Sequence, residues 1–98
     1  IINMTKLVIR VENVNDKLIQ RDWVNYMEAI EECLSEFVTK VFFCGHSRVT
    51  DNVQSLVWII EYNKVQQDRL VLMLREIEGM NKMKDSINLD SVSGSWLL

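Results

Sequence analysis

The stretch SLVWIIEY, Ser55–Tyr62, decides the fold, because its apolar residues fall on both faces of a strand. Successive side chains of a strand point to opposite sides of the sheet. The apolar residues therefore form two sets, Leu56, Trp58 and Ile60 on one face and Val57 and Ile59 on the other. A strand that is apolar on both faces is typical of a central position in its sheet. We predict a central strand here.

Three further strands are indicated around it. Residues 6–12 read KLVIRVE, with Leu7, Ile9 and Val11 alternating against Lys6, Arg10 and Glu12, which predicts a half-buried strand. Residues 40–49, KVFFCGHSRV, predict a second strand, in which Gly45 marks a bulge or a close approach. Residues 86–92, SINLDSV, predict a last strand.

Two helices separate these strands. From residue 17 to residue 39 the apolar residues follow a 3.6-residue period, in the set Trp23, Tyr26, Met27, Ile30, Leu34, Phe37 and Val38. Asn15 or Asp16 is a suitable cap for this helix. Residues 63–79 predict a second helix, with Asn63 as its cap, Gln66 completing a capping box and Gly79 as its stop. Residues 69–74, RLVLML, also fit a strand, and that alternative stays open.

The resulting order is β-α-β-β-α-β, which resembles the ferredoxin-like α+β fold, a four-stranded antiparallel sheet with two helices on one face. That fold places its first and third strands in the middle, as the doubly apolar third strand requires. We expect residues 1–98 to form a single domain. Met4 resembles a natural start, so we expect residues 1–3 to lie outside the fold.

Composition narrows the class of function. The net charge of −3 argues against nucleic acid as a partner. Two cysteines without a signal peptide indicate free thiols in the cytoplasm, and no apolar run is long enough to span a membrane. One histidine and two cysteines are too few for a zinc site, so we expect no metal and no cofactor.

Two helices cover one side of a sheet, so the other side stays open. We expect this open face to carry Arg10, His46, Arg48, Val57 and Ile59. An exposed apolar patch on a small protein indicates an interface. We therefore expect a homodimer, formed by the sheets or by the apolar tail of residues 93–98 with Trp96, Leu97 and Leu98. The alternative is that the tail covers its own sheet.

The segment around His46 raises the question of catalysis. Alternation places Cys44, His46 and Arg48 on one face of a strand, where a thiol, a base and an anion-binding group would serve nucleophilic chemistry. Side chains two residues apart on a strand are roughly 6.5–7 Å apart at their bases, which is long for a thiolate–imidazole contact. No third, orienting group is evident, so we predict a structural role and no catalytic residue here.

One edge of the first helix is acidic. Glu28, Glu32 and Glu36 recur every four residues and Glu31 lies beside them, which gives either a solvated face or a docking surface for a basic protein. Our leading hypothesis is a dimeric protein-binding module, such as an antitoxin, immunity protein or other inhibitor, that uses this edge and the open face.

Two alternatives are kept. A metal-dependent endoribonuclease would use Glu12 at the end of the first strand, with Asp16 and Asp90 nearby, at a dimer seam. This reading rests on analogy of fold. A small-molecule sensor would hold a ligand beside Trp58 and His46.

Overall fold

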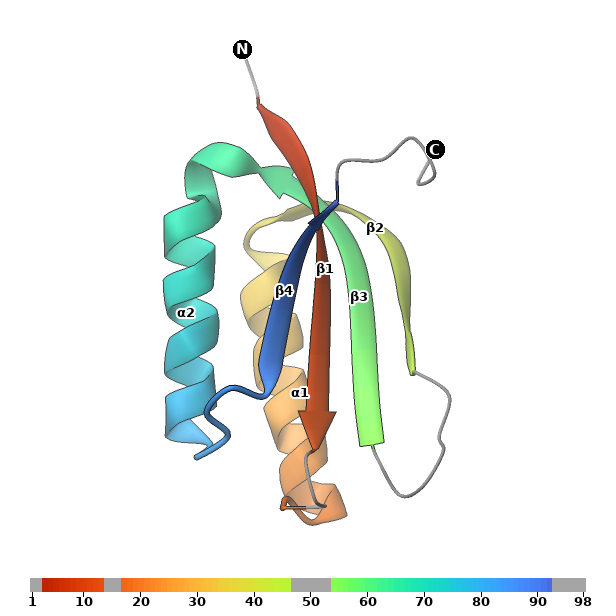
Figure 1. The fold of residues 1–98 in the computed structure, drawn as a ribbon, viewed down its shortest axis with the longest axis vertical. Helices are drawn as coiled ribbons and strands as arrows, with labels where there is room; N and C mark the ends of the chain where they lie inside the picture. The colour runs from red at the N-terminus through yellow and green to blue at the C-terminus, as the bar shows by residue number, and fades with distance from the viewer. Residues whose placement is uncertain (1–2, 14–16, 47–53, 93–98) are drawn as a thin grey trace.

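The computed structural model describes residues 3–13, 17–46 and 54–92. Its elements are, in order, β1 (Met4–Asn13), α1 (Gln20–Ser35), β2 (Val38–His46), β3 (Gln54–Asn63), the 3₁₀ turn η2 (Lys64–Gln66), α2 (Gln67–Met80) and β4 (Ile87–Val92). The strands form one antiparallel sheet in the order β2-β3-β1-β4. Figure 1 shows α1 behind β1 and β4, and α2 beside β4 at the left. The ferredoxin-like α+β fold is confirmed, and β3 is central as its two apolar faces require.

The core lies between the helices and the sheet. Its buried side chains come from β1, β3, β4 and both helices, and include Ile9 and Val11 of β1, Ile30 of α1, Ile60 of β3 and Leu74 of α2, while β2 contributes the partly buried Val38. Each of these five side chains is 0% exposed. The predicted apolar stripe of the first helix supplies the helix side of the core, since Trp23, Tyr26, Met27 and Leu34 are also buried there. No helix in the described part of the chain is long and apolar enough to cross a membrane.

The first helix is shorter than predicted at both ends. It begins at Gln20 and ends at Ser35, whereas the 3.6-residue period continues to Val38. Phe37 is buried in the turn after the helix, and Val38 already pairs with Tyr62 as the first residue of β2. Val38 belongs to the strand because its backbone pairs with β3. Its position in the sequence nevertheless continues the 3.6-residue period of the helix. The predicted caps Asn15 and Asp16 lie outside the described residues.

The second helix is confirmed, and the strand alternative for residues 69–74 is wrong. Asn63 does act as a cap, since its Oδ1 accepts a hydrogen bond from the Val65 amide at 3.1 Å. Gln66 makes no side-chain cap hydrogen bond at the start of α2. Gly79 does not end the helix, which continues to Met80, and the residues with left-handed backbone after it are Lys82, at φ 57°, and Asp85, at φ 65°.

Residue 3 takes part in the fold, contrary to expectation. The carbonyl oxygen of Asn3 accepts a hydrogen bond of 2.8 Å from the amide of Lys64, where β3 passes into η2. This bond extends the β1–β3 pairing by one step beyond Met4, which pairs with Asn63. The boundary we drew at Met4 is therefore wrong for Asn3.

Candidate binding surfaces

The open face, the side of the sheet that α1 and α2 leave uncovered, can be assigned from the strand register. Leu7, Ile9 and Val11 of β1 join the core, so the alternate residues of β1 and their partners point the other way. The open face consists of Lys6, Val8, Arg10 and Glu12 from β1, Val57, Ile59 and Glu61 from β3, Asn88 and Asp90 from β4, and Lys40, Phe42 and Phe43 from β2. An apolar strip crosses the middle of this face, and charged residues flank it.

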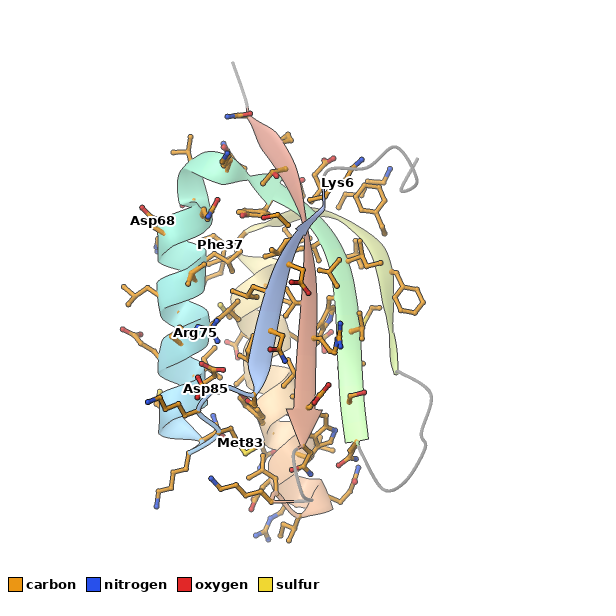
Figure 2. All side chains as sticks on the ribbon, in the orientation of Figure 1. Lys6, Phe37, Asp68, Arg75, Met83 and Asp85 are labelled. Carbon is orange, nitrogen blue, oxygen red and sulfur yellow. The ribbon has the colours of Figure 1, made fainter. Side chains whose placement is uncertain are left out.

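Two consecutive phenylalanines contribute to this strip because β2 is irregular. The register of β2 shifts between Val41 and Phe43, and a bulge of this kind breaks the strict alternation of side chains. The Phe42 ring lies 4.8 Å from the Lys40 ammonium nitrogen and 5.3 Å from that of Lys6, both measured to the ring centre. Phe43 is 49% exposed, which is unusual for so large an apolar side chain. Figure 2 shows Lys6 near the upper end of the sheet.

Three of the residues expected on the open face lie there, namely Arg10, Val57 and Ile59. Arg48 and the tail residues Trp96, Leu97 and Leu98 fall outside the described residues. His46 is the last residue of β2 and its backbone pairs with Leu56, while its side chain lies outside the described part of the structure. Gly45 shows the close approach that we considered, because a Cβ atom there would lie 3.0 Å from the Phe43 ring.

Cys44 belongs to the opposite side of the sheet from these residues. It pairs with Trp58, a core residue, and its side chain lines a pocket of about 330 Å³ between α1 and the β2 edge of the sheet. We call this pocket the groove. Its lining residues are Glu31, Leu34 and Ser35 of α1, Val38, Val41 and Cys44 of β2, and Trp58 and Ile60 of β3.

The groove does not favour thiol chemistry. Burial raises the pKa of the Cys44 thiol, and the nearby Glu31 carboxylate raises it further. A thiol with a raised pKa stays protonated at neutral pH, and the thiolate is the nucleophilic form. Cys44 therefore acts as an apolar wall residue. Burial and Glu36 likewise raise the pKa of Cys33, which is buried in the core, and both cysteines are free thiols.

The acidic edge of α1 is exposed as expected. Glu28, Glu31, Glu32 and Glu36 all lie at the surface, and the last turn of the helix contains no basic residue. The ion pairs in the described part of the chain are Arg21–Asp22 and Arg75–Glu78, so the four glutamates have no cationic partner there. This edge is a concentrated negative charge available to a partner.

The carboxylates of the endoribonuclease alternative are not gathered in one subunit. Glu12 pairs with Ser55, while Asp90 pairs with Val8, four residues along β1 from Glu12. Four residues of a strand span roughly 13 Å, beyond the reach of a shared metal ion. Asp16 lies outside the described residues. Across residues 3–13, 17–46 and 54–92, no three histidine, cysteine or acidic side chains gather at a metal-binding distance.

The sequence did not predict that Phe42 and Phe43 lie together on the open face. Strict alternation of side chains along a strand would allow only one of the neighbours Phe42 and Phe43 on a face. The bulge that turns both rings outward depends on how β2 pairs with β3, and no local sequence pattern reports that pairing. Lys6 and Lys40 were visible only as polar positions.

Comparison with known proteins supports the fold and goes no further. No family model and no curated protein matches the chain. Among solved structures, the chain is similar to the de novo designed protein Foldit4, with a TM-score of 0.58 at 19% identity over 94% of this chain and 99% of the design. It is equally similar to a DUF3240 family protein from Shewanella baltica OS155, with a TM-score of 0.58 at 16% identity over 97% and 93% of the two chains.

A conserved protein from Methanosarcina mazei Go1 has a TM-score of 0.51 at 10% identity, over 93% of this chain and 94% of that one. At these identities the likeness shows the fold alone. A ferredoxin-like fold carries many unrelated functions, so function has to be argued from the surfaces described above.

Proposed function

We propose that this protein is a dimeric, cytoplasmic protein-binding module of the inhibitor type, in the manner of an antitoxin or immunity protein. The open face joins two copies, and the acidic edge of α1 binds a basic protein. The observation that carries the proposal is the apolar strip of Val8, Phe42, Phe43, Val57 and Ile59, which lies on a sheet face that neither helix covers.

The strip has the character of an interface. Phe43 is half exposed, and exposed aromatic residues framed by polar ones are typical of protein contact sites. The charged residues that flank the strip are of both signs at each end, since Glu61 pairs with Lys6 and with Lys40, and Arg10 lies two residues from Glu12 on β1. A partner with an apolar patch framed by charges of both signs is complementary to this face.

A second copy of the chain meets this requirement. A two-fold axis between two facing sheets, perpendicular to the strands, sets the Lys6 and Lys40 end of one copy against the Glu12 end of the other. Such an interface is isologous, the commonest kind in soluble oligomers. In this arrangement Glu12 of each copy is separated from Glu12 of the other, so the endoribonuclease alternative is not favoured.

The dimer leaves the acidic edge of α1 on the outside, because α1 lies on the other side of the sheet (Figure 1). Charge complementarity of this kind chiefly accelerates encounter and excludes wrong partners. The proposed partner is therefore a protein with a basic surface, such as a nuclease or another nucleic-acid-binding protein.

The dimer is tested with Phe43→Glu, matched by Leu72→Glu, since Leu72 is a similarly exposed apolar residue on α2, at 59%. Light scattering is expected to give a dimer for the natural chain and for Leu72→Glu, and a folded monomer for Phe43→Glu. A natural chain that is monomeric at 100 micromolar or so, far above the Kd of a stable dimer, contradicts the proposal.

The partner surface is tested by the double variant Glu28→Lys/Glu32→Lys, with Glu76→Lys on α2 as the control for charge. Basic proteins captured from the source cells are purified, and their affinities for each variant are measured at low and high salt. The double variant is expected to lose binding and its salt dependence. Equal affinity for the natural chain and the double variant rules out the acidic edge as the docking surface.

A further inference from the structure

The groove between α1 and β2 is the feature of the molecule that the proposed function leaves unused. Its floor is apolar, formed by Leu34, Trp58 and Ile60 beneath the β2 edge. At about 330 Å³ it is at the small end of the range of about 300–1,000 Å³ that is typical of ligand pockets. It lies on the opposite side of the sheet from the open face, so a dimer formed there does not cover it.

The groove lies at one edge of the sheet, where Glu31, Leu34 and Ser35 of α1 face residues of β2 and β3. β2 is the edge strand there, and Figure 1 shows α2 away from it, on the side of β4. Trp58 is 4% exposed and Val41 is 53% exposed, so the groove runs from a buried indole wall to an open mouth. An apolar group inserted at the mouth exchanges water contact for contact with Val41 and Cys44, the exposed residues of the lining.

The groove has few polar groups, and they determine which charge a ligand should carry. The Ser35 hydroxyl donates to the Glu32 carbonyl at 2.6 Å, which engages its proton within the helix. Glu31 contributes the charged group of the lining, and it is close enough to the Cys44 thiol to affect its titration. Glu28 and Glu32 are exposed on the same helix, and they add negative charge on the α1 side of the groove.

We propose that this groove is a binding site for a small amine, a molecule with an aromatic or branched aliphatic body and one protonated nitrogen. The body lies against Val38, Val41 and Cys44 above the buried floor, and the ammonium group lies at the mouth beside the Glu31 carboxylate. The same acidic mouth excludes carboxylates and phosphates. The site shares Glu31 with the acidic edge of α1 but lies on the opposite side of the sheet from the open face, so its occupation does not require a dimer.

The test uses two probes of equal shape and opposite charge, 4-phenylbutylamine and 4-phenylbutyrate, titrated into the full-length protein at low salt. Amide chemical shifts of Leu34, Val41 and Cys44 report occupation of the groove. The amine is expected to shift these resonances saturably and to bind at least fivefold more tightly than the carboxylate. Equal binding of the two probes, or no saturable shift with the amine, overturns the proposal.

Two pairs of variants locate the site. Glu31→Gln is expected to weaken amine binding two- to fivefold, the size of an exposed ion pair, whereas Glu76→Gln on α2 leaves it unchanged. Val41→Trp fills the mouth and is expected to abolish binding, whereas Val65→Trp, at a site 79% exposed in η2, does not. Equal effects within either pair contradict the assignment.

A third probe separates a small molecule from a protein segment with the same chemistry. The acetylated tripeptide amide leucine–lysine–leucine offers an amine and apolar side chains on a peptide backbone. Binding of 4-phenylbutylamine at the groove supports the small-molecule site. If the tripeptide binds and the amine does not, the groove is a site for a protein partner, and the small-molecule proposal is overturned.

Discussion

At the scale of single residues, the buried Glu78 carboxylate is the polar group that holds the start of β4. Its Oε2 accepts hydrogen bonds from the amide of Ile87 at 2.8 Å and from Nη1 of Arg75 at 2.9 Å. The same Arg75 nitrogen donates to the Ile87 carbonyl at 2.8 Å. Figure 2 shows Arg75 on α2, in position to bridge to the start of β4. These hydrogen bonds tie the start of β4 to α2.

Glu78→Leu is expected to lower the free energy of unfolding by about 2–3 kcal/mol, because it leaves the buried Ile87 amide without an acceptor. Glu78→Gln keeps an acceptor oxygen for that amide and is expected to cost about half as much. Chemical denaturation measures both. A loss below about 0.5 kcal/mol for the leucine variant would show that Glu78 is not the anchor of β4.

Tyr26 links the middle of α1 to the residue before β4. Its hydroxyl lies 2.6 Å from Ser86 Oγ, and its ring is 0% exposed. Burial raises the pKa of Tyr26 to about 12, against the lowering effect of the Ser86 hydrogen bond. The unfolded chain therefore releases this proton at lower pH than the folded chain does.

The stabilisation from a raised pKa is fully present below pH 10 and is lost as pH rises from 10 toward 12. Between pH 9 and pH 11 the natural chain is expected to lose about 1 kcal/mol more stability than Tyr26→Phe, which has no proton to release. At pH 7 Tyr26→Phe should cost about 1 kcal/mol, the value of its hydrogen bond. Parallel stability curves for the two proteins across this pH range would contradict the assignment.

At the scale of elements, α1 begins without a side chain that caps its first turn. Ile19 occupies the N-cap position with φ −68° and ψ 163°, the extended geometry of a capping residue, but offers no side-chain acceptor. Its carbonyl already accepts from the Trp23 amide at 2.9 Å, so the backbone is ready for a cap. Asn13 orders the approach instead, since its side chain bonds both the amide and the carbonyl of Leu18.

Ile19→Ser is expected to raise the free energy of unfolding by about 1 kcal/mol, because serine supplies the missing acceptor for the first turn. Ile19 is 59% exposed, so little burial is lost in the exchange. Ile19→Ala, which removes the same side chain and adds no acceptor, should show no gain. Thermal and chemical unfolding of the three proteins decides this, and equal stabilities of serine and alanine variants would refute a capping effect.

The strands show where sequence periodicity succeeds and where it ends. Alternation located β1 and β3 to within a few residues and assigned their faces, because both pair regularly along their length. It misjudged β2, whose two register shifts turn Phe42 and Phe43 to one face. Gly45 drew attention as a possible bulge, yet the shifts occur earlier in the strand.

At the scale of the whole molecule, the expected assembly is two copies joined through the open face. The apolar tail at residues 93–98 offers an independent route to the same dimer, and it lies outside the described residues. Light scattering of a chain truncated before Trp96 is expected to show a weakened dimer, because three large apolar side chains are lost. The Kd of the truncated dimer should rise at least tenfold over that of the full chain.

The outcome separates the two routes. An unchanged Kd would assign the dimer wholly to the strip around Phe43, whereas a stable dimer of Phe43→Glu in the full chain would assign it to the tail. Unfolding of the truncated chain, seen by circular dichroism, would instead give the tail a role in its own subunit and contradict its role between subunits.

The sequence by itself determined the elements and their order, because local side-chain periods and the doubly apolar SLVWIIEY stretch require them. It also determined the acidic edge of α1, since residues four apart on a helix share a side. The tertiary structure alone decided the surfaces between elements. The Phe42–Phe43 strip and the groove beside Trp58 both arise from how β2 pairs with β3 and how far α1 stands from that edge. Those distances depend on contacts between residues remote in the chain, and no local pattern records them.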